Sequence, residues 1–221
     1  MKVKHILPLI ATVVATAFGG SVCSNCNHYK LWGTTTFRNG VKLPLYVVTD
    51  DGVAGGEDTP PKKHNLRSNF VMPKDQKDKF VTFHDNSGLE LIPKGMVPTN
   101  GNVGNESNGI EYKWLNGKGS ISIEENQGRW NLECFGAEWF GTSKDRKETG
   151  CYPPKHIRYI YRNKGLIIAE QYHVKHPDLL TTIIVDAGAE VDITLPKNDK
   201  KLRNTLVRYY TQWIKNWYDN Q

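Results

Sequence analysis

The stretch Thr181-Thr-Ile-Ile-Val-Asp-Ala-Gly-Ala-Glu-Val-Asp-Ile-Thr-Leu195 decides the fold. Two short runs rich in β-branched residues, Thr181–Val185 and Glu190–Leu195, flank the turn-forming segment Asp186–Ala189. Runs of this length around a glycine-containing turn predict a β-hairpin. We therefore expect paired strands here, just before a segment whose apolar residues follow a different period.

Four earlier segments repeat this pattern of two strand-like runs around a turn. The clearest turn is Asn39-Gly40, the dipeptide that best fits a tight type I′ hairpin. Arg129–Phe135 alternates as a further strand would, and we expect Glu138–Gly141 to extend its sheet. Short strands at this spacing predict a mainly β fold, an antiparallel β-sandwich or barrel of about ten strands. The four earlier hairpins are expected over Leu31–Thr49, Lys79–Ile92, Ile110–Glu124 and Ile157–Val174.

The C-terminal segment changes period and predicts one amphipathic α-helix over residues 198–218. Asn198 is a suitable N-cap, and apolar residues then recur at helical spacing with polar residues opposite them. We expect the aromatic face to dock on the sheet. Weak contact with a membrane surface and contact with RNA are the alternatives for the same basic and aromatic residues. The apolar positions are Leu202, Leu206, Tyr209, Tyr210, Trp213, Ile214 and Trp217.

Two long segments resist assignment to strands. Asp50–Lys79 is rich in Gly, Asp, Pro and Lys, and Pro93–Gly109 is rich in Gly and Asn. Both are expected to be exposed loops, and Lys62-Lys63 in the first could be cut as a dibasic processing site. Asn105-Glu-Ser107 in the second fits the acceptor pattern for N-glycosylation, so Asn105 is the expected glycosylation site.

Residues 1–17 have the features of a secretory signal peptide. A short basic start leads into an apolar run from Ile6 to Val14, and Ala15-Thr-Ala17 supplies small residues where a signal peptidase cuts. The apolar run is too short to cross a bilayer, and we expect no transmembrane segment. The predicted mature protein is a single secreted domain over residues 18–221, long enough to bury its own core.

The positive charge of the chain is concentrated near its C-terminus. The full chain carries a net charge of +6, and removal of the signal peptide, with its two lysines and no acidic residue, leaves +4. The same excess is found within residues 196–221 alone, so the rest of the mature chain is close to neutral. A local excess of this kind is weak evidence for nucleic-acid binding, and we do not expect a nucleic-acid partner.

Four cysteines predict two structural disulfides, and three pairings are possible. We prefer Cys23 and Cys26 each bonded to one of Cys134 and Cys151, because closing a long loop restricts the unfolded chain most. A redox site at Cys23-x-x-Cys26 and zinc binding by the four thiols are less favoured, since a β-rich segment rather than a helix follows the first pair.

One hydrolase hypothesis rests on the fourth hairpin. The candidate catalytic residues are His156, Arg158, Glu170 and His173, because a ribonuclease-like enzyme needs a general acid, a general base and a cation. Strict strand alternation places His156, Arg158 and Arg162 on one face, and it places Glu170 and His173 on opposite faces. These side chains therefore share one site only if a bulge intervenes, and solvated cross-strand charge pairs are the simpler interpretation.

A second hydrolase hypothesis takes two carboxylates as a glycosidase pair, with tryptophans stacking on sugar rings. The same tryptophans would also serve a lectin-like protein without catalysis. We expect no cofactor and no metal, and the acidic segment Asp50–Asp58 lacks the spacing of an EF-hand loop. The residues considered are Glu124, Glu125, Glu133, Glu138, Trp114, Trp130 and Trp139.

The sequence therefore favours a secreted, disulfide-stabilised binding protein, of the kind seen in microbial effectors and virulence factors, over an enzyme. Its partner is expected to be a protein or glycan outside the producing cell. Long loops on a β scaffold would carry the contact, with Trp114, Trp139, Lys62 and Lys63 as candidate binding residues. A small ribonuclease-like or glycosidase-like hydrolase is the alternative.

Overall fold

A computed structural model describes residues 29–48, 62–85, 88–103, 107–126, 134–163, 165–186 and 188–217. These residues form two β-sheets and a long C-terminal helix, in a sandwich-like arrangement of about twelve strands. The mainly β class, the five hairpins and the C-terminal helix are thereby confirmed. The signal peptide, Cys23, Cys26 and Asn105 lie outside the described residues, and their predictions stay as predictions.

The smaller sheet has five strands in the order β3-β1-β2-β4-β5. Two predicted hairpins, β1–β2 and β4–β5, pair antiparallel, whereas β3 runs parallel to β1 and β4 runs parallel to β2. A 3-10 helix, η1 (Lys74–Lys79), leads into β4. The strands are β1 (Tyr29–Phe37), β2 (Lys42–Val48), β3 (Asn65–Ser68), β4 (Phe80–Asp85) and β5 (Gly88–Pro93).

The larger sheet has seven strands in the order β6-β7-β8-β12-β11-β10-β9, and all neighbours are antiparallel. Strand β12 shows clean alternation, with Val191, Ile193 and Leu195 buried and the residues between them partly exposed. The strands are β6 (Met96–Val103), β7 (Ser107–Trp114), β8 (Ser120–Asn126), β9 (Ile157–Arg162), β10 (Leu166–Tyr172), β11 (Leu179–Asp186) and β12 (Ala189–Pro196).

Three local predictions were wrong. Strand β6 occupies most of the expected loop Pro93–Gly109, and β3 and η1 lie within the expected loop Asp50–Lys79. Glu138–Gly141 extends no sheet, because Gly136–Phe140 forms a π-helical turn, η2. The four-residue spacing of Phe135 and Trp139 suits a helical turn, and both side chains are buried together against the sheet.

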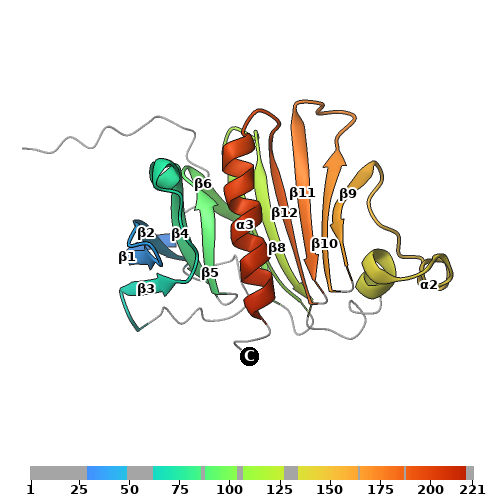
Figure 1. Cartoon of the computed structure of the whole chain (residues 1–221), viewed down its shortest axis with the longest axis horizontal. Coiled ribbons are helices and arrows are strands. Elements are labelled where there is room, and N and C mark those ends of the chain that lie inside the picture. The colour runs from blue at the N-terminus through green and yellow to red at the C-terminus, as the bar shows by residue number, and fades with distance from the viewer. Residues whose placement is uncertain are drawn as a thin grey trace, which may run out of the picture.

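Helix α3 (Lys200–Trp217) connects the two sheets. It lies lengthwise across the face of the larger sheet, between β5 and β12 (Figure 1). The Tyr209 and Tyr210 hydroxyls donate hydrogen bonds of 2.6 and 3.1 Å to the Leu89 and Leu91 carbonyls of β5. Both rings are buried in a core cluster drawn from both sheets, which confirms that the aromatic face docks inward.

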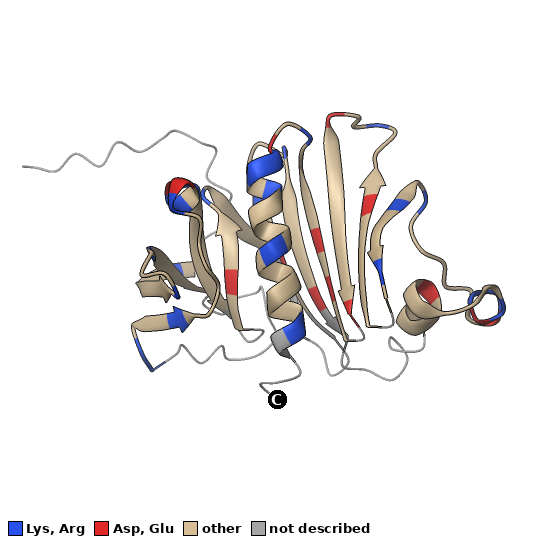
Figure 2. Cartoon of the chain, viewed as in Figure 1, with Lys and Arg blue, Asp and Glu red and all other residues tan. Residues whose placement is uncertain are grey.

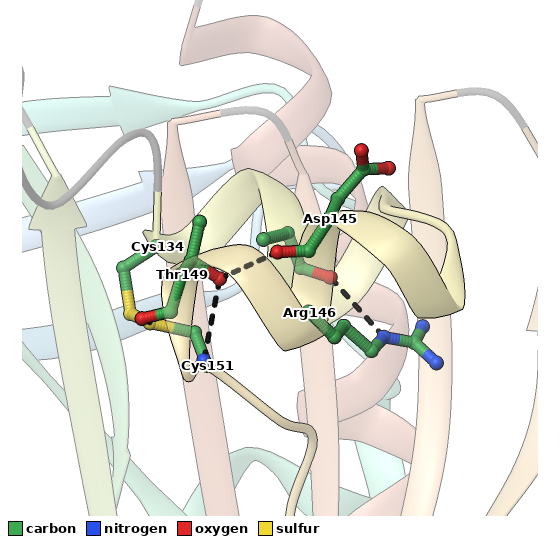
Figure 3. Close-up of a disulfide and its surroundings, with 6 residues drawn as sticks. Cys134, Asp145, Arg146, Thr149 and Cys151 are labelled. Carbon is green, nitrogen blue, oxygen red and sulfur yellow. Dashed lines mark hydrogen bonds between the residues drawn. A yellow bond between two sulfur atoms is a disulfide. The ribbon is translucent and has the colours of Figure 1, made fainter.

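The described disulfide joins Cys134 to Cys151 and differs from the preferred pairing. The two cysteines are 17 residues apart and flank η2 and α2 (Ser143–Thr149), and this compact helical segment brings their Cα atoms within 5.4 Å. A capping box at Thr142 and Asp145 starts α2. Thr149 then ties the end of the helix to the disulfide, because its hydroxyl donates to the Asp145 carbonyl and accepts from the Cys151 amide (Figure 3).

Replacing both cysteines, Cys134→Ser with Cys151→Ser, should lower the free energy of unfolding by about 3 kcal/mol, the entropic cost of freeing a loop of this size. Urea unfolding of the oxidised protein measures the difference, with Lys147→Ser on the exposed side of α2 as the control. Non-reducing peptide mapping should recover a Cys134–Cys151 cross-linked peptide. Recovery of Cys134 bonded to Cys23 or Cys26 would contradict the described pairing.

Candidate anion-binding cleft

A cleft with a volume of about 360 Å³ lies where the first turn of α3 faces the ends of β10 and β11. Basic side chains dominate its walls, and one carboxylate lies among them. Figure 2 shows basic residues at the start of α3 and on β9, two of the elements that contribute residues to the cleft. The lining residues are Arg158, Glu170, Tyr172, Leu180, Lys197, Lys200, Arg203 and Asn204.

Strand pairing positions the β9–β10 wall of the cleft. Arg158 lies opposite Glu170 in the register, and its guanidinium donates to the Glu170 carboxylate at 2.6 Å. The Tyr172 hydroxyl, two residues along the same face, donates to the same carboxylate at 3.2 Å. The hydrogen bond from Arg158 to Glu170 raises the pKa of Arg158, so this cation persists over the whole working range of pH.

The Tyr172 ring organises the cations around it. The Arg158 guanidinium lies 5.9 Å from the ring centroid and the Lys197 ammonium lies 5.6 Å from it, both within cation–π range. The ring is 38% exposed, so part of its surface is open to a ligand. An aromatic surface flanked by two cations can bind a planar or anionic group from solvent.

Arg203 supplies a cation that the protein neutralises incompletely. The residue is buried, and its guanidinium donates to the Pro196 carbonyl at 2.8 Å and the Leu195 carbonyl at 3.5 Å. Its Nε atom is buried without a hydrogen-bond partner, and among the described residues no carboxylate lies within salt-bridge distance of it. Burial lowers the pKa of Arg203, and the charges of Glu170 and Asp199 oppose this shift only in part. An anion in the cleft would stabilise the guanidinium further.

The charges of the cleft decide what it can do chemically. Four basic side chains face one carboxylate, so the cleft keeps a positive excess after Arg158 and Glu170 pair. Arginine presents planar paired donors, and lysine presents a mobile ammonium, which together suit carboxylate, sulfate or phosphate groups. The geometry therefore favours binding of an anionic group.

Only two of the four predicted catalytic residues meet in this cleft. Arg158 and Glu170 pair there, but the His173 ring is hydrogen-bonded at 2.7 Å to the Thr181 hydroxyl, whose pairing with Gln171 places it on the opposite face. His156 is exposed with a left-handed backbone (φ 62°), and its carbonyl accepts from the Tyr172 amide. The expected separation of Glu170 from His173 is thus observed.

The predicted face shared by Arg158 and Arg162 was wrong because β9 contains a bulge. Tyr161 pairs with Ile168 and Tyr159 with Ala169, so Ile160 is an extra residue between them. One added residue reverses the alternation, and the Arg162 guanidinium instead lies 5.1 Å from the Tyr159 ring and bonds the Trp139 carbonyl. Arg158 and Arg162 therefore occupy opposite faces.

The predicted binding residues do not gather into one surface. Trp139 is fully buried and donates its indole N–H to Glu190 at 2.9 Å, so it presents no ring to a ligand. Trp114 packs partly against the main core, and its indole N–H contacts the Lys94 carbonyl at 3.2 Å. Lys62 and Lys63 are exposed just before β3. Three strands separate Trp114 on β7 from the cleft wall on β10.

A group of carboxylates lies on the other face of the larger sheet. Glu190 and Asp192 follow the alternate positions of β12, Glu124 pairs directly with Glu190 across the strands, and Glu138 approaches from η2. Burial raises the pKa of Glu190 to about 9 and that of Asp192 to about 7. Repulsion from Glu124 and Glu138 adds to both shifts, and Asp192 further raises the pKa of Glu190. Asp192 Oδ1 is buried without a hydrogen-bond partner. Across the part of the chain that the structure describes, no set of His, Cys, Asp or Glu is placed to hold a metal ion.

Sequence reasoning found Arg158 and Glu170 but missed Lys197, Lys200, Arg203 and Tyr172. The three cations were visible only as part of a basic C-terminal segment. Their place in the sequence could have revealed them. They lie at the start of a helix that follows directly on a strand and packs back onto the sheet, so the first turn of that helix must lie near a strand end.

Comparison of the chain with protein-family models, curated proteins and solved structures gives no match. Across the described ranges, none of the helices combines the length and apolar character needed to span a membrane.

The buried carboxylates should make the protein less stable as pH rises. Folded Glu190 and Asp192 hold their protons to higher pH than in the unfolded chain. Their contribution is therefore complete below about pH 4, declines as pH rises from there, and is lost above about pH 7 for Asp192 and about pH 9 for Glu190. Urea unfolding at pH 5 and pH 9 should show a loss on the order of a few kcal/mol. The double variant Glu190→Gln with Asp192→Asn should remove most of this loss, whereas Glu148→Gln on exposed α2 should not. Equal pH slopes in all three proteins would contradict this assignment.

Proposed function

We propose that this protein is a secreted, disulfide-stabilised binding protein that recognises an anionic group on a partner outside the producing cell. The cleft between α3 and β10 is the proposed contact. One observation carries the proposal: four cations converge on a cleft that offers a single carboxylate in return. A partner with carboxylate or sulfate groups would supply the missing negative charge.

Rigid support favours binding at this cleft. The helix that holds Lys200 and Arg203 is fixed to both sheets, and the strands that hold Arg158 and Tyr172 are paired in register. Side chains held in place lose less conformational entropy on binding, which raises affinity. The Cys134–Cys151 disulfide fits an oxidising compartment, and the signal-like residues 1–17 point to the same location.

The side-chain arrangement favours binding over hydrolysis. A nuclease-like mechanism needs a general acid and a general base within reach of one substrate atom. Glu170 is occupied by Arg158 and Tyr172, and His173 lies on the other face with Thr181. The buried carboxylates lie beneath η2 on that other face, beside a fully buried Trp139.

The double variant Lys197→Gln with Lys200→Gln should weaken binding to anionic probes by roughly tenfold, because two of the four cleft cations are lost. Fluorescence anisotropy with a labelled poly-glutamate peptide and with a heparin fragment, at several salt concentrations, measures the effect. Lys144→Gln with Lys147→Gln on α2 is the matched control, since it removes the same charge from exposed positions outside the cleft. Equal losses in the two double variants would show that only the net charge matters and would overturn the proposed cleft.

The mature protein should begin at Phe18. Expression of the full chain in a secretion-competent host, followed by N-terminal sequencing of the exported product, tests this directly. Retention of Met1–Ala17 on the finished protein, or failure to export it, would contradict the proposed secretion.

A further inference from the structure

Among the residues that the structure describes, no strand pairs with the outer edge of β9 in the larger sheet. Strand β9 is the last strand in the order, and each described backbone hydrogen bond of Ile157–Arg162 runs to β10. Only one of its six residues is even partly buried. An open edge presents a row of backbone donors and acceptors on which another strand can pair.

The side chains of β9 suit contact with another chain. Tyr159, Ile160 and Tyr161 are 37%, 53% and 46% exposed, and Tyr172 of the adjoining strand is 38% exposed. Exposed aromatic and apolar side chains beside an unpaired strand edge favour contact with another chain here. Because the bulge at Ile160 turns Tyr159 and Tyr161 to opposite faces, an added strand would find an aromatic side chain on each of its sides.

The charges around β9 favour one kind of strand to pair with it. Arg158 on one face and Arg162 on the other give the open strand a positive charge on both sides, and Arg158 also lines the basic cleft. A second copy of this strand would bring arginines against arginines, which costs free energy. A segment with acidic residues would bring opposite charges together.

We infer that β9 pairs with an extended acidic segment of a partner protein, which joins the larger sheet as an eighth strand and places its acidic side chains against Arg158, Arg162 and the cleft. This inference rests on the proposed function and names the partner class as protein. The backbone would supply the affinity, and the two arginines and exposed aromatic residues would supply the selectivity.

The test uses two labelled ten-residue peptides with the same charge. One repeats Glu-Glu-Val-Val (the Glu-Val peptide) and can form a strand with carboxylates on both faces. The other has each Val replaced by Pro, which removes amide hydrogens on both edges of the peptide and disfavours strand pairing. The full mature chain should bind the Glu-Val peptide at least about tenfold more tightly. Hydrogen–deuterium exchange should then show new protection of the β9 amides. Arg162→Glu should weaken the Glu-Val peptide by about tenfold yet leave heparin-fragment binding at the cleft unchanged, whereas Lys144→Glu should affect neither.

Other results of these binding experiments would overturn one or both proposals. Equal affinity for the two peptides, with protection confined to the start of α3, would overturn strand pairing while the anion-binding cleft stands. A heparin fragment that binds while both peptides fail would replace the protein partner with a glycan. Failure of all three probes would overturn both proposals. A dimer in light scattering that Arg162→Glu dissociates would show that a second copy occupies β9.

Discussion

Attachment of helix α3 to both sheets is the constraint on which the rest of the structure depends. Its buried tyrosines reach the backbone of β5, and its apolar face covers β11 and β12. Each buried aromatic contributes roughly 2–3 kcal/mol by area, before the cost of ordering it is counted. Because the helix cannot rotate without breaking these contacts, its first turn is held at the strand ends. The cleft exists there as a consequence of core packing.

The larger sheet separates two kinds of ionisable group onto its two faces. One face carries the main core cluster and, at its margin, the cations of the cleft. The other carries Glu190 and Asp192, although both come from the strand that supplies Ile193 to the core. Two-residue alternation makes this separation possible, because successive side chains point to opposite sides of the sheet. The cations of the cleft and the carboxyl groups that retain their protons are therefore kept apart, on opposite faces of one sheet.

The sequence predicted the features that depend on neighbouring residues. Asn39-Gly40 and the other turns defined five hairpins, and the period of the last segment defined α3, which begins at Lys200, two residues after the expected N-cap.

Strand pairing between distant segments was not predictable from the sequence. Strand β6 is rich in Gly and Asn and exists because β7 supplies its hydrogen bonds, and the bulge at Ile160 has no local marker. The pairing of Cys134 with Cys151 depends on how η2 and α2 fold between them, and the number of cysteines carries no information about that. The sequence predicted only the β9–β10 wall of the cleft, because these two strands are neighbours in the chain. The cleft residues on α3 are distant in sequence from that wall, so their approach was not predicted.

The seven-stranded sheet consists of two meanders. Strands β6 to β8 form one, β9 to β12 form the other, and they join only where β8 meets β12. Each meander can form from neighbouring chain segments, but the joint requires closure of a long loop, so it is the natural last step of assembly. Glu124 and Glu190 face each other across this same joint. Above about pH 9 the ionised Glu190 carboxylate would repel Glu124 across this joint, so alkaline pH acts on the one pairing that holds the two meanders in a single sheet.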